Sequence, residues 1–383
     1  MRYGRLLGFV VVVALFAGLW LTGTARGAQP PLPASKHIFI ISIDGLGSEA
    51  YGALKYGALQ TLADQGLISE KSLAVRAADL AAGEASLLTG RNPEDHGAKN
   101  ASDGQVDAES LFDVMRNHGK SLLVVDSTGG ELKGFSHGSK QYLKVKEKND
   151  LLVMKQAFDS FNREKPYLTY IYLGQPRKAL ERHDREAYYV ALDYSQQAVG
   201  YLLHQLEAGG IAGYCTIVVT SARSSSNSNL VPIIIKSPGI QPETKIDGMK
   251  VTDLAGTICA FTNLSSVYAS RGVIPWAVTK TSSASATAYY QDRQIKEMYR
   301  DRLDTSQQYY RLQDHRDSLV KELERADREK RSIFDFVGQR DQTLTQLRKR
   351  LVFTHSAFIG LIGIFGLGYY LEYRFLRKRY NLF

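Results

Sequence analysis

Residues 36 to 268 alternate short, apolar, β-rich runs with amphipathic stretches that have the period of a helix. The predicted strands are residues 37–43, 121–125, 167–173, 215–220 and 231–235. The predicted helices are residues 57–65, 107–117, 151–162, 186–207 and 251–262. Strands that are separated by helices pair mainly in parallel, because each crossover helix packs on a face of the sheet. The alternation therefore predicts an α/β domain over residues 36–268, with a mainly parallel sheet sandwiched by helices.

An apolar segment near the N-terminus indicates export. Arg2 and Arg5 precede an apolar run, and the small residues 23–25 follow it. This pattern is typical of a cleaved signal peptide, and the run could also serve as an uncleaved signal anchor, so residues 1–28 are either of the two. Residues 29–35 contain three prolines and are predicted to be a linker.

The chain after the α/β domain predicts a helical stalk. Residues 269–287 are rich in Ser, Thr and Ala and are predicted to be a second linker, and residues 288–350 are polar and charged. Apolar side chains recur in the stalk at intervals of three, four or their sums: Leu319, Leu323, Ala326, Ile333, Val337, Leu344, Leu347 and Leu351. This spacing is typical of a coiled-coil seam, which Lys330 and Arg340 interrupt, and a solvated single helix is the alternative. A seam predicts a protein partner or a homo-oligomer formed through residues 288–350.

Residues 351–371 are apolar over about the length that crosses a bilayer, which predicts one C-terminal transmembrane helix. The basic tail, residues 372–383, favours a cytoplasmic C-terminus. The α/β domain is then expected on the extracytoplasmic, periplasmic side of the cytoplasmic membrane. Much of the net charge of +9 lies beside the two apolar ends. That location favours contact with a membrane surface, and no nucleic-acid partner is predicted.

The sequence contains two cysteines, Cys215 and Cys259. Both stand in apolar contexts, which predicts buried side chains that act as small hydrophobic groups. A single bridge between them in an oxidising compartment is the alternative.

Five segments carry a family resemblance. They are residues 38–45 (IFIISIDG), 59–66 (LQTLADQG), 85–93 (ASLLTGRNP), 216–221 (TIVVTS) and 231–240 (VPIIIKSPGI). In this order they resemble the alkaline phosphatase superfamily, especially its type I phosphodiesterase and sulfatase branches, over roughly residues 36–265. The resemblance implies an alkaline phosphatase-like α/β fold. It also implies that Asp44, at the end of the first strand, stands where the superfamily has a metal ligand.

The same resemblance implies that the catalytic nucleophile is missing. Counting back from the TG pair at 89–90, the nucleophile position is occupied by Leu80, which has no lone pair for attack. Glu84 replaces an expected arginine, and its negative charge would repel an anionic ester. The hydroxyls of Ser86 and Thr89 are predicted to cap the local backbone, and His96 is predicted to be structural.

Most metal-ligand positions implied by the resemblance are also changed. Ala222 and Arg223 stand where the superfamily has an Asp-His pair, and Arg177 and Glu181 fall near a further Asp and His. Asp44 alone is retained, as a vestigial ligand. One carboxylate does not hold a two-metal centre, so no cofactor is expected.

These losses favour a membrane-anchored, catalytically inactive domain that binds or scaffolds other molecules. One alternative is a divergent metal-dependent phosphodiesterase, phosphatase or sulfatase with a rebuilt site that uses Asp44, His183, Asp184 or Ser86, and only this alternative requires Zn, Mn or Ca. The other alternative is a coiled-coil oligomerisation or complex-anchoring membrane protein with a passive α/β head.

Overall fold

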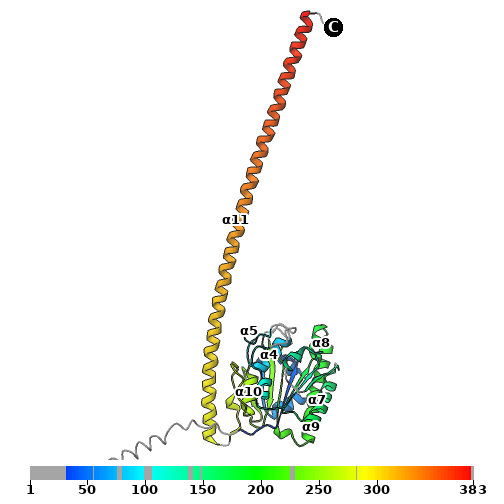
Figure 1. The fold of residues 1–383 in the computed structure, drawn as a ribbon, viewed down its shortest axis with the longest axis vertical. Coiled ribbons are helices and arrows are strands. Elements are labelled where there is room, and N and C mark those ends of the chain that lie inside the picture. Colours follow the sequence, from blue (N-terminus) through cyan, green and yellow to red (C-terminus); the bar gives the residue numbers. More distant parts are fainter. Residues whose placement is uncertain are drawn as a thin grey trace, which may run out of the picture. The chain divides into compact units, whose positions relative to one another are not determined.

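A computed structural model describes residues 32–380, except for residues 55, 76–79, 99–105, 137–140, 147–148, 225–228 and 282. The segment predicted as a signal peptide or anchor lies outside the described residues. One sheet forms the centre of the α/β part (Figure 1). Its strands are β1 (His37–Ile43), β2 (Leu67–Leu73), β3 (Leu122–Asp126), β4 (Gln141–Lys144), β5 (Leu168–Leu173), β6 (Cys215–Thr220), β7 (Leu230–Lys236) and β8 (Thr244–Lys245).

The strand order is β4-β3-β5-β1-β6-β7-β2-β8. Strands β4, β3, β5, β1 and β6 pair in parallel, as do β2 and β8, whereas β7 is antiparallel to both of its neighbours. The prediction of a mainly parallel sheet is confirmed. β1 lies between β5 and β6, so the carboxyl ends of these three strands meet at one edge.

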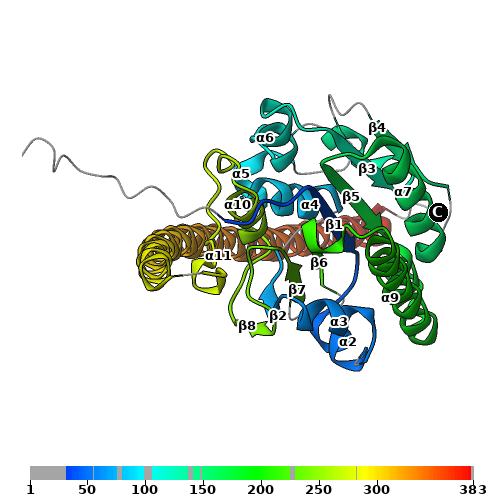
Figure 2. The same cartoon turned by 90° about the horizontal axis from the view of Figure 1, so that it is seen from below.

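Helices cover both faces of the sheet. They are α2 (Ser48–Ala53), α3 (Ala58–Asp64), α4 (Leu80–Thr89), α5 (Pro93–His96), α6 (Leu111–Asn117), α7 (Asp150–Glu164), α8 (Gln175–Glu181), α9 (Arg185–Ala208) and α10 (Asp253–Phe261). The last helix of the chain is α11 (Ala284–Tyr380). Three 3₁₀ turns, η1 (Glu131–Ser136), η2 (Ala212–Tyr214) and η3 (Trp276–Val278), complete the described elements. Figure 2 shows α4 and α10 on one side of the sheet and α2 and α3 on the other.

The alternation of side chains along β1 divides the core into two parts. Ile38 and Ile40 belong to a cluster that includes residues of α4, α6 and α10. Phe39 and Ile41 belong to a second cluster with residues of α2, α3, α7 and α9. Successive side chains of a strand point to opposite faces, so the sheet is buried on both sides, as expected for parallel pairing.

The two cysteines are buried and unpaired, as predicted from their apolar contexts. Cys259 belongs to the cluster on the α10 side, and Cys215 belongs to the cluster on the α9 side. The sheet therefore separates the two thiols, and the alternative of a bridge between them is not met in this structure.

The periodicity did not predict β2 or α4. Glu70 and Lys71 interrupt the apolar pattern of β2, and the register of its pairing with β7 shifts between Ser69 and Ser72. All ten residues of α4 are buried, so the helix has no polar face to produce an amphipathic period.

The segments predicted as linkers pack on the α/β core within the part of the chain that is described. Trp276, which is 2% exposed, stacks on Tyr290 of α11 at 5.5 Å between ring centroids. The guanidinium of Arg293 lies 4.2 Å from the centre of the Trp276 ring. At the other linker, Leu32 is buried and the hydroxyl of Ser35 lies 2.6 Å from that of Thr216. The compact α/β unit consequently extends to Leu303, beyond the predicted boundary at residue 268.

The stalk and the span predicted after it form one helix, α11, and its residues from Asp304 onward make up a second unit. The apolar seam side chains of this unit are exposed. α11 is long and apolar enough to cross a membrane, with a mean hydropathy of 1.8 in its most apolar window. It is the one such helix among the described residues.

Candidate functional site

A group of buried, paired polar side chains lies at the edge of the sheet where β5, β1 and β6 end. Asp44 follows β1 directly, Arg177 lies in α8 just after β5, and Arg223 follows β6 by three residues. Gly45, with a φ of +92°, turns the chain after Asp44 in a conformation that side chains disfavour. Its N–H donates to the hydroxyl of Ser221 at 3.2 Å. Ligands bind at this edge in open α/β sheets.

Asp44 is paired with a cation. Its side chain is 2% exposed, and the guanidinium of Arg223 donates directly to its Oδ2 atom. The hydroxyl of Tyr172 donates to the same oxygen at 2.5 Å. Two donors thus hold one oxygen of the carboxylate, and one of them carries a full positive charge.

Arg177 lies on the other side of the carboxylate. Its Nε atom is 4.0 Å from Oδ1 of Asp44 and 3.7 Å from a carboxylate oxygen of Glu181, which lies four residues further along α8. Neither the Nε atom of Arg177 nor the Oδ1 atom of Asp44 has a hydrogen-bond partner within the described structure. Asp44 is therefore flanked by two guanidinium groups.

The pairing with Asp44 favours the charged form of Arg223. Burial alone opposes a charged guanidinium, but Coulombic attraction to Asp44 and the hydrogen bond that Arg223 donates to it together raise the pKa of Arg223 above its ordinary value. Arg223 is a permanent cation at this position.

Glu84 of α4 forms a second buried polar cluster on the same side of the sheet. It accepts hydrogen bonds from the hydroxyl of Ser42 at 2.7 Å and from the hydroxyl of Tyr170. Burial raises the pKa of Glu84 to about 7, and the charge of Asp44 adds to this effect, while both hydroxyls and Arg223 oppose it. Glu84 therefore titrates near neutral pH inside the fold.

Leu80, which the resemblance assigns to the nucleophile position, is the first residue of α4. Its side chain is 7% exposed and belongs to the apolar cluster on the α4 side of the sheet. The side chain packs in the core and offers no atom for nucleophilic attack.

The hydroxyls of α4 bond locally. Ser86 donates to the carbonyl of Ala82 at 3.1 Å and lies 2.9 Å from Nε2 of His96, and both Ser86 and His96 are fully buried. Thr89 donates to the carbonyl of Ala85 at 2.7 Å. These bonds match the structural roles predicted for the three side chains.

The presence of glycine at position 90, in the TG pair, has a structural explanation. Its φ is +68°, and a Cβ atom there would lie 2.1 Å from the hydroxyl oxygen of Ser270 and 2.9 Å from the carbonyl oxygen of Thr252. A side chain is excluded both by backbone strain and by space, so folding alone requires glycine at this position.

The residues at this edge do not fit a two-metal centre. Such a centre needs several carboxylates or imidazoles around each dication. No group of three or more His, Cys, Asp or Glu side chains suited to a metal is present among the described residues. One oxygen of Asp44 is engaged by Arg223 and Tyr172, and the guanidinium groups on both sides would repel a dication.

The four residues proposed for a rebuilt catalytic site do not lie in one common environment: two are exposed and two are buried. His183 and Asp184 are exposed at the start of α9, where the carboxylate of Asp184 accepts a hydrogen bond from the N–H of Ala187 at 2.9 Å and caps the helix. Ser86 is buried beside His96, and Asp44 is buried beside Arg223.

Sequence reasoning noted the position of Arg223 but missed its partner. It treated the arginine only as the replacement of an expected metal ligand. The available signal was that Arg177 and Arg223 both stand where the resemblance expects ligands of one metal centre, and both positions follow strands that neighbour β1. The hydrogen bonds that Tyr170 and Tyr172 donate to Glu84 and Asp44 were also missed, because tyrosines in buried strands usually act as core residues.

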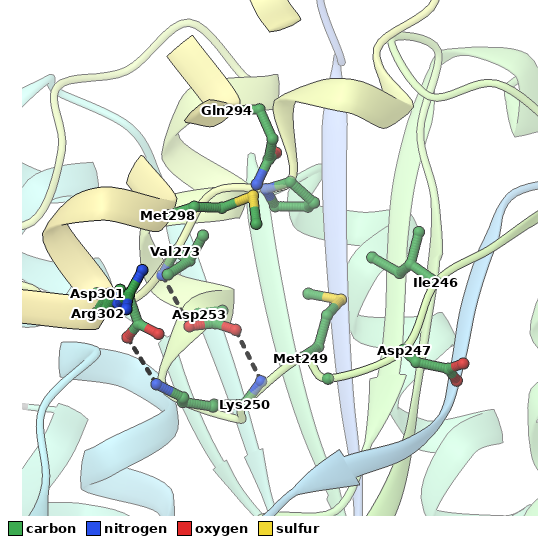
Figure 3. A pocket seen from close by; sticks show the side chains of 12 residues that line it. Ile246, Asp247, Met249, Lys250, Asp253, Val273, Gln294, Met298, Asp301 and Arg302 are labelled. Atoms are coloured by element: carbon green, nitrogen blue, oxygen red, sulfur yellow. Dashed lines mark hydrogen bonds and ion pairs between the residues drawn. The ribbon is translucent and has the colours of Figure 1, made fainter. Parts of the chain in front are cut away.

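A separate cavity of about 300 Å³ lies between residues 246–250 and the first turns of α11 (Figure 3). The ammonium group of Lys250 pairs with Asp301 of α11 at 2.6 Å. The buried carboxylate of Asp253 accepts hydrogen bonds from the N–H groups of Lys250 and Val273 at 2.7 and 2.8 Å. Because these groups satisfy one another, they fasten the base of α11 to the α/β unit.

No protein-family profile matches the sequence, and no curated protein matches it. Solved structures do match. A phosphonate monoester hydrolase from Silicibacter pomeroyi is 13% identical, with a TM-score of 0.52 over 65% of this chain and 78% of that one. An inactive variant of murine ectonucleotide pyrophosphatase/phosphodiesterase 5, in complex with AMP, is 11% identical, with a TM-score of 0.51 over 61% and 96%. A 2-O GAG sulfatase is 14% identical, with a TM-score of 0.53 over 63% and 74%. The expected alkaline phosphatase-like fold is thereby confirmed.

Proposed function

We propose that this alkaline phosphatase-like chain is a membrane-anchored pseudoenzyme whose α/β domain binds or scaffolds other molecules outside the cytoplasmic membrane. The observation that carries the proposal is the ion pair between Asp44 and Arg223, with Arg177 on the other side of the carboxylate. The guanidinium of Arg223 neutralises Asp44 at the position where the resemblance to the superfamily implies a metal ion.

The chemistry that is lost supports the proposal. Two-metal hydrolysis requires dications that activate a nucleophile and stabilise the charge of the transition state. Leu80 cannot act as the nucleophile. A guanidinium carries a single charge and has no open coordination position for an attacking oxygen. The buried Asp44–Arg223 pair instead joins the loops that follow β1 and β6.

The proposed location rests on α11. Its apolar segment is followed by Arg374, Arg377, Lys378 and Arg379. These basic residues favour a cytoplasmic end for the helix, which leaves the α/β domain outside. Protease treatment of intact spheroplasts is expected to remove the α/β domain and to spare the tail, and the opposite pattern would contradict this orientation.

Metal analysis and turnover assays on the purified full-length protein test the loss of catalysis. We expect no stoichiometric Zn, Mn or Ca and no hydrolysis of an aryl phosphodiester, an aryl sulfate or a phosphonate monoester. A stoichiometric metal together with turnover that is lost in Asp44→Ala would refute the proposal in favour of a rebuilt hydrolase. The Asp159→Ala variant, which changes an exposed carboxylate of α7 outside every candidate site, is the matched control.

A second candidate function is oligomerisation or complex anchoring through α11, with the α/β domain as a passive head. It is favoured by the exposed apolar side chains along the stalk, such as Leu323, Ile333 and Leu347. Removal of residues 304–350 from the chain is expected to abolish self-association or partner binding. Binding that persists after the deletion would locate the interaction surface on the α/β unit.

A further inference from the structure

The seam of α11 keeps one register over six heptads. From Tyr309 to Leu351, steps of three and four residues alternate without an insertion. The a positions are Tyr309, Arg316, Leu323, Lys330, Val337, Leu344 and Leu351, and the d positions are Leu312, Leu319, Ala326, Ile333, Arg340 and Leu347. A heptad register that continues over this length without an insertion is the pattern of a left-handed coiled coil, and three of its a and d positions, Arg316, Lys330 and Arg340, are cationic.

The 309–351 seam is solvent-exposed in the single chain. Leu323 is 72% exposed, Ile333 63% and Leu347 56%. Helices in proteins gain most of their stability by packing an apolar face against a neighbour, and the apolar face of this segment has no such neighbour in the described structure. The seam therefore requires a partner helix.

The charged seam residues identify the partner. Lys330, at an a position, directly follows Glu329 at g, and Arg340, at a d position, directly precedes Asp341 at e. In a parallel, in-register pair of helices, an a side chain packs beside the g residue of the other helix, and a d side chain packs beside its e residue. The layers of Lys330 and Arg340 then each receive an acid from a second copy of the same chain, whereas Arg316, the third cation of the seam, has His315 at the adjacent g position.

The charges also select the register. A slip of one heptad would place Lys330 beside Phe336 or Glu322 of the other copy, and Arg340 beside Phe334 or Arg348. Neither slip gives both cations an acid, whereas in-register pairing does. Within the described residues, no ion pair involves the side chain of Lys330 or Arg340 in the single chain.

We infer that α11 forms a parallel, in-register, two-stranded coiled coil with a second copy of this chain, in which Lys330–Glu329 and Arg340–Asp341 pairs cross between the helices. The parallel direction rests on the proposed function, because two copies anchored by the same apolar segment in one membrane must run side by side. Two strands suit charged a and d residues, since long cationic side chains in a two-stranded coil can reach its solvated flanks.

The test measures the mass of the full-length protein in detergent by sedimentation velocity. The wild type is expected to be a dimer. Lys330→Glu puts a second acid beside Glu329 in each copy, so four acids meet at one layer of the coiled coil. Their repulsion should weaken self-association by about tenfold or more. Adding Glu329→Lys to that variant restores opposite charges and should restore the dimer. Lys321→Glu makes the same charge change at an outward-facing f position and should leave the dimer intact.

Cysteine cross-linking tests direction and register. Val337→Cys at an a position should form a disulfide-linked dimer on oxidation, and Asp335→Cys at the outward f position should not. A monomeric or trimeric wild type, or a dimer that Lys330→Glu does not weaken, overturns the inference. A dimer without the Val337→Cys cross-link shows another direction or register and also overturns it. Ester turnover would refute only the proposed pseudoenzyme, since it leaves the mass and the cross-link unchanged.

Discussion

Replacing Arg223 should destabilise the α/β unit more than a surface substitution, because it leaves a charge buried. The side chain of Asp44 is 2% exposed, and that of Arg223 is 14% exposed. Removing one partner of a buried ion pair typically lowers the free energy of unfolding by about 3–5 kcal/mol. In Arg223→Met the volume is largely kept, so the loss should come mainly from the unpaired carboxylate.

The reverse substitution should have a smaller effect. Asp44→Asn keeps an acceptor for the hydroxyl of Tyr172, and the partly exposed Arg223 can turn toward water. We expect a loss of about 1–3 kcal/mol from the weakened hydrogen bonding. The double variant, Asp44→Asn with Arg223→Met, removes both charges and should be more stable than the sum of the single losses predicts, with a coupling of about 1–3 kcal/mol.

Urea unfolding of the full-length protein measures these changes through the fluorescence of Trp276, which is buried in the α/β unit. Trp20 is the other tryptophan of the chain, so Trp20→Phe serves as the common background. Additive losses in the double variant, or an Arg223→Met loss below about 0.5 kcal/mol, which is the range of neutral surface changes, would refute the ion pair as the central contact.

Further predictions concern pH, metals and packing. Glu84 has its pKa raised to about 7 in the fold from 4.5, so its stabilising contribution is present below pH 4.5 and is lost as the pH rises through 7. Glu84→Gln should lack this loss of about 3 kcal/mol in urea unfolding between pH 4.5 and 7.5, and Asp150, whose pKa burial also raises to about 7, contributes equally to both proteins. Dialysis against EDTA should leave the melting temperature unchanged, whereas loss of a bound dication at 100 times its Kd would cost about 2.7 kcal/mol. Trp276→Ala should cost about 3–5 kcal/mol, since it removes the buried ring that packs on the base of α11, and it is measured by urea titration followed by circular dichroism because the fluorescent reporter is lost. Gly90→Ala should lower thermal stability by about 1–3 kcal/mol through its positive φ, and a neutral result would contradict the geometry of that turn.

Much of the fold follows from local patterns. The run at 37–43 and the run at 215–220 matched β1 and β6 at both ends. Strand β8, of two residues, and the fully buried α4 could not be found in this way, because periodicity requires a longer element or two different faces. The segment predicted as a linker, residues 269–287, shows a similar limit of local patterns. Its polar composition hid Trp276, whose burial depends on α11, which lies later in the chain.

Which chemical groups the protein carries follows from the order of its residues alone. It has Leu80 at the position that the resemblance assigns to the nucleophile, arginines at positions of expected ligands, and a heptad repeat along the stalk. These properties belong to single residues and to their spacing, so they can be read without coordinates. The ion pair between Asp44 and Arg223, which are 179 residues apart, exists only because the folded chain brings them together. The parallel pairing of β1 with β5 and β6 brings three strand ends to one edge, and this long-range register places both guanidinium groups beside the retained carboxylate.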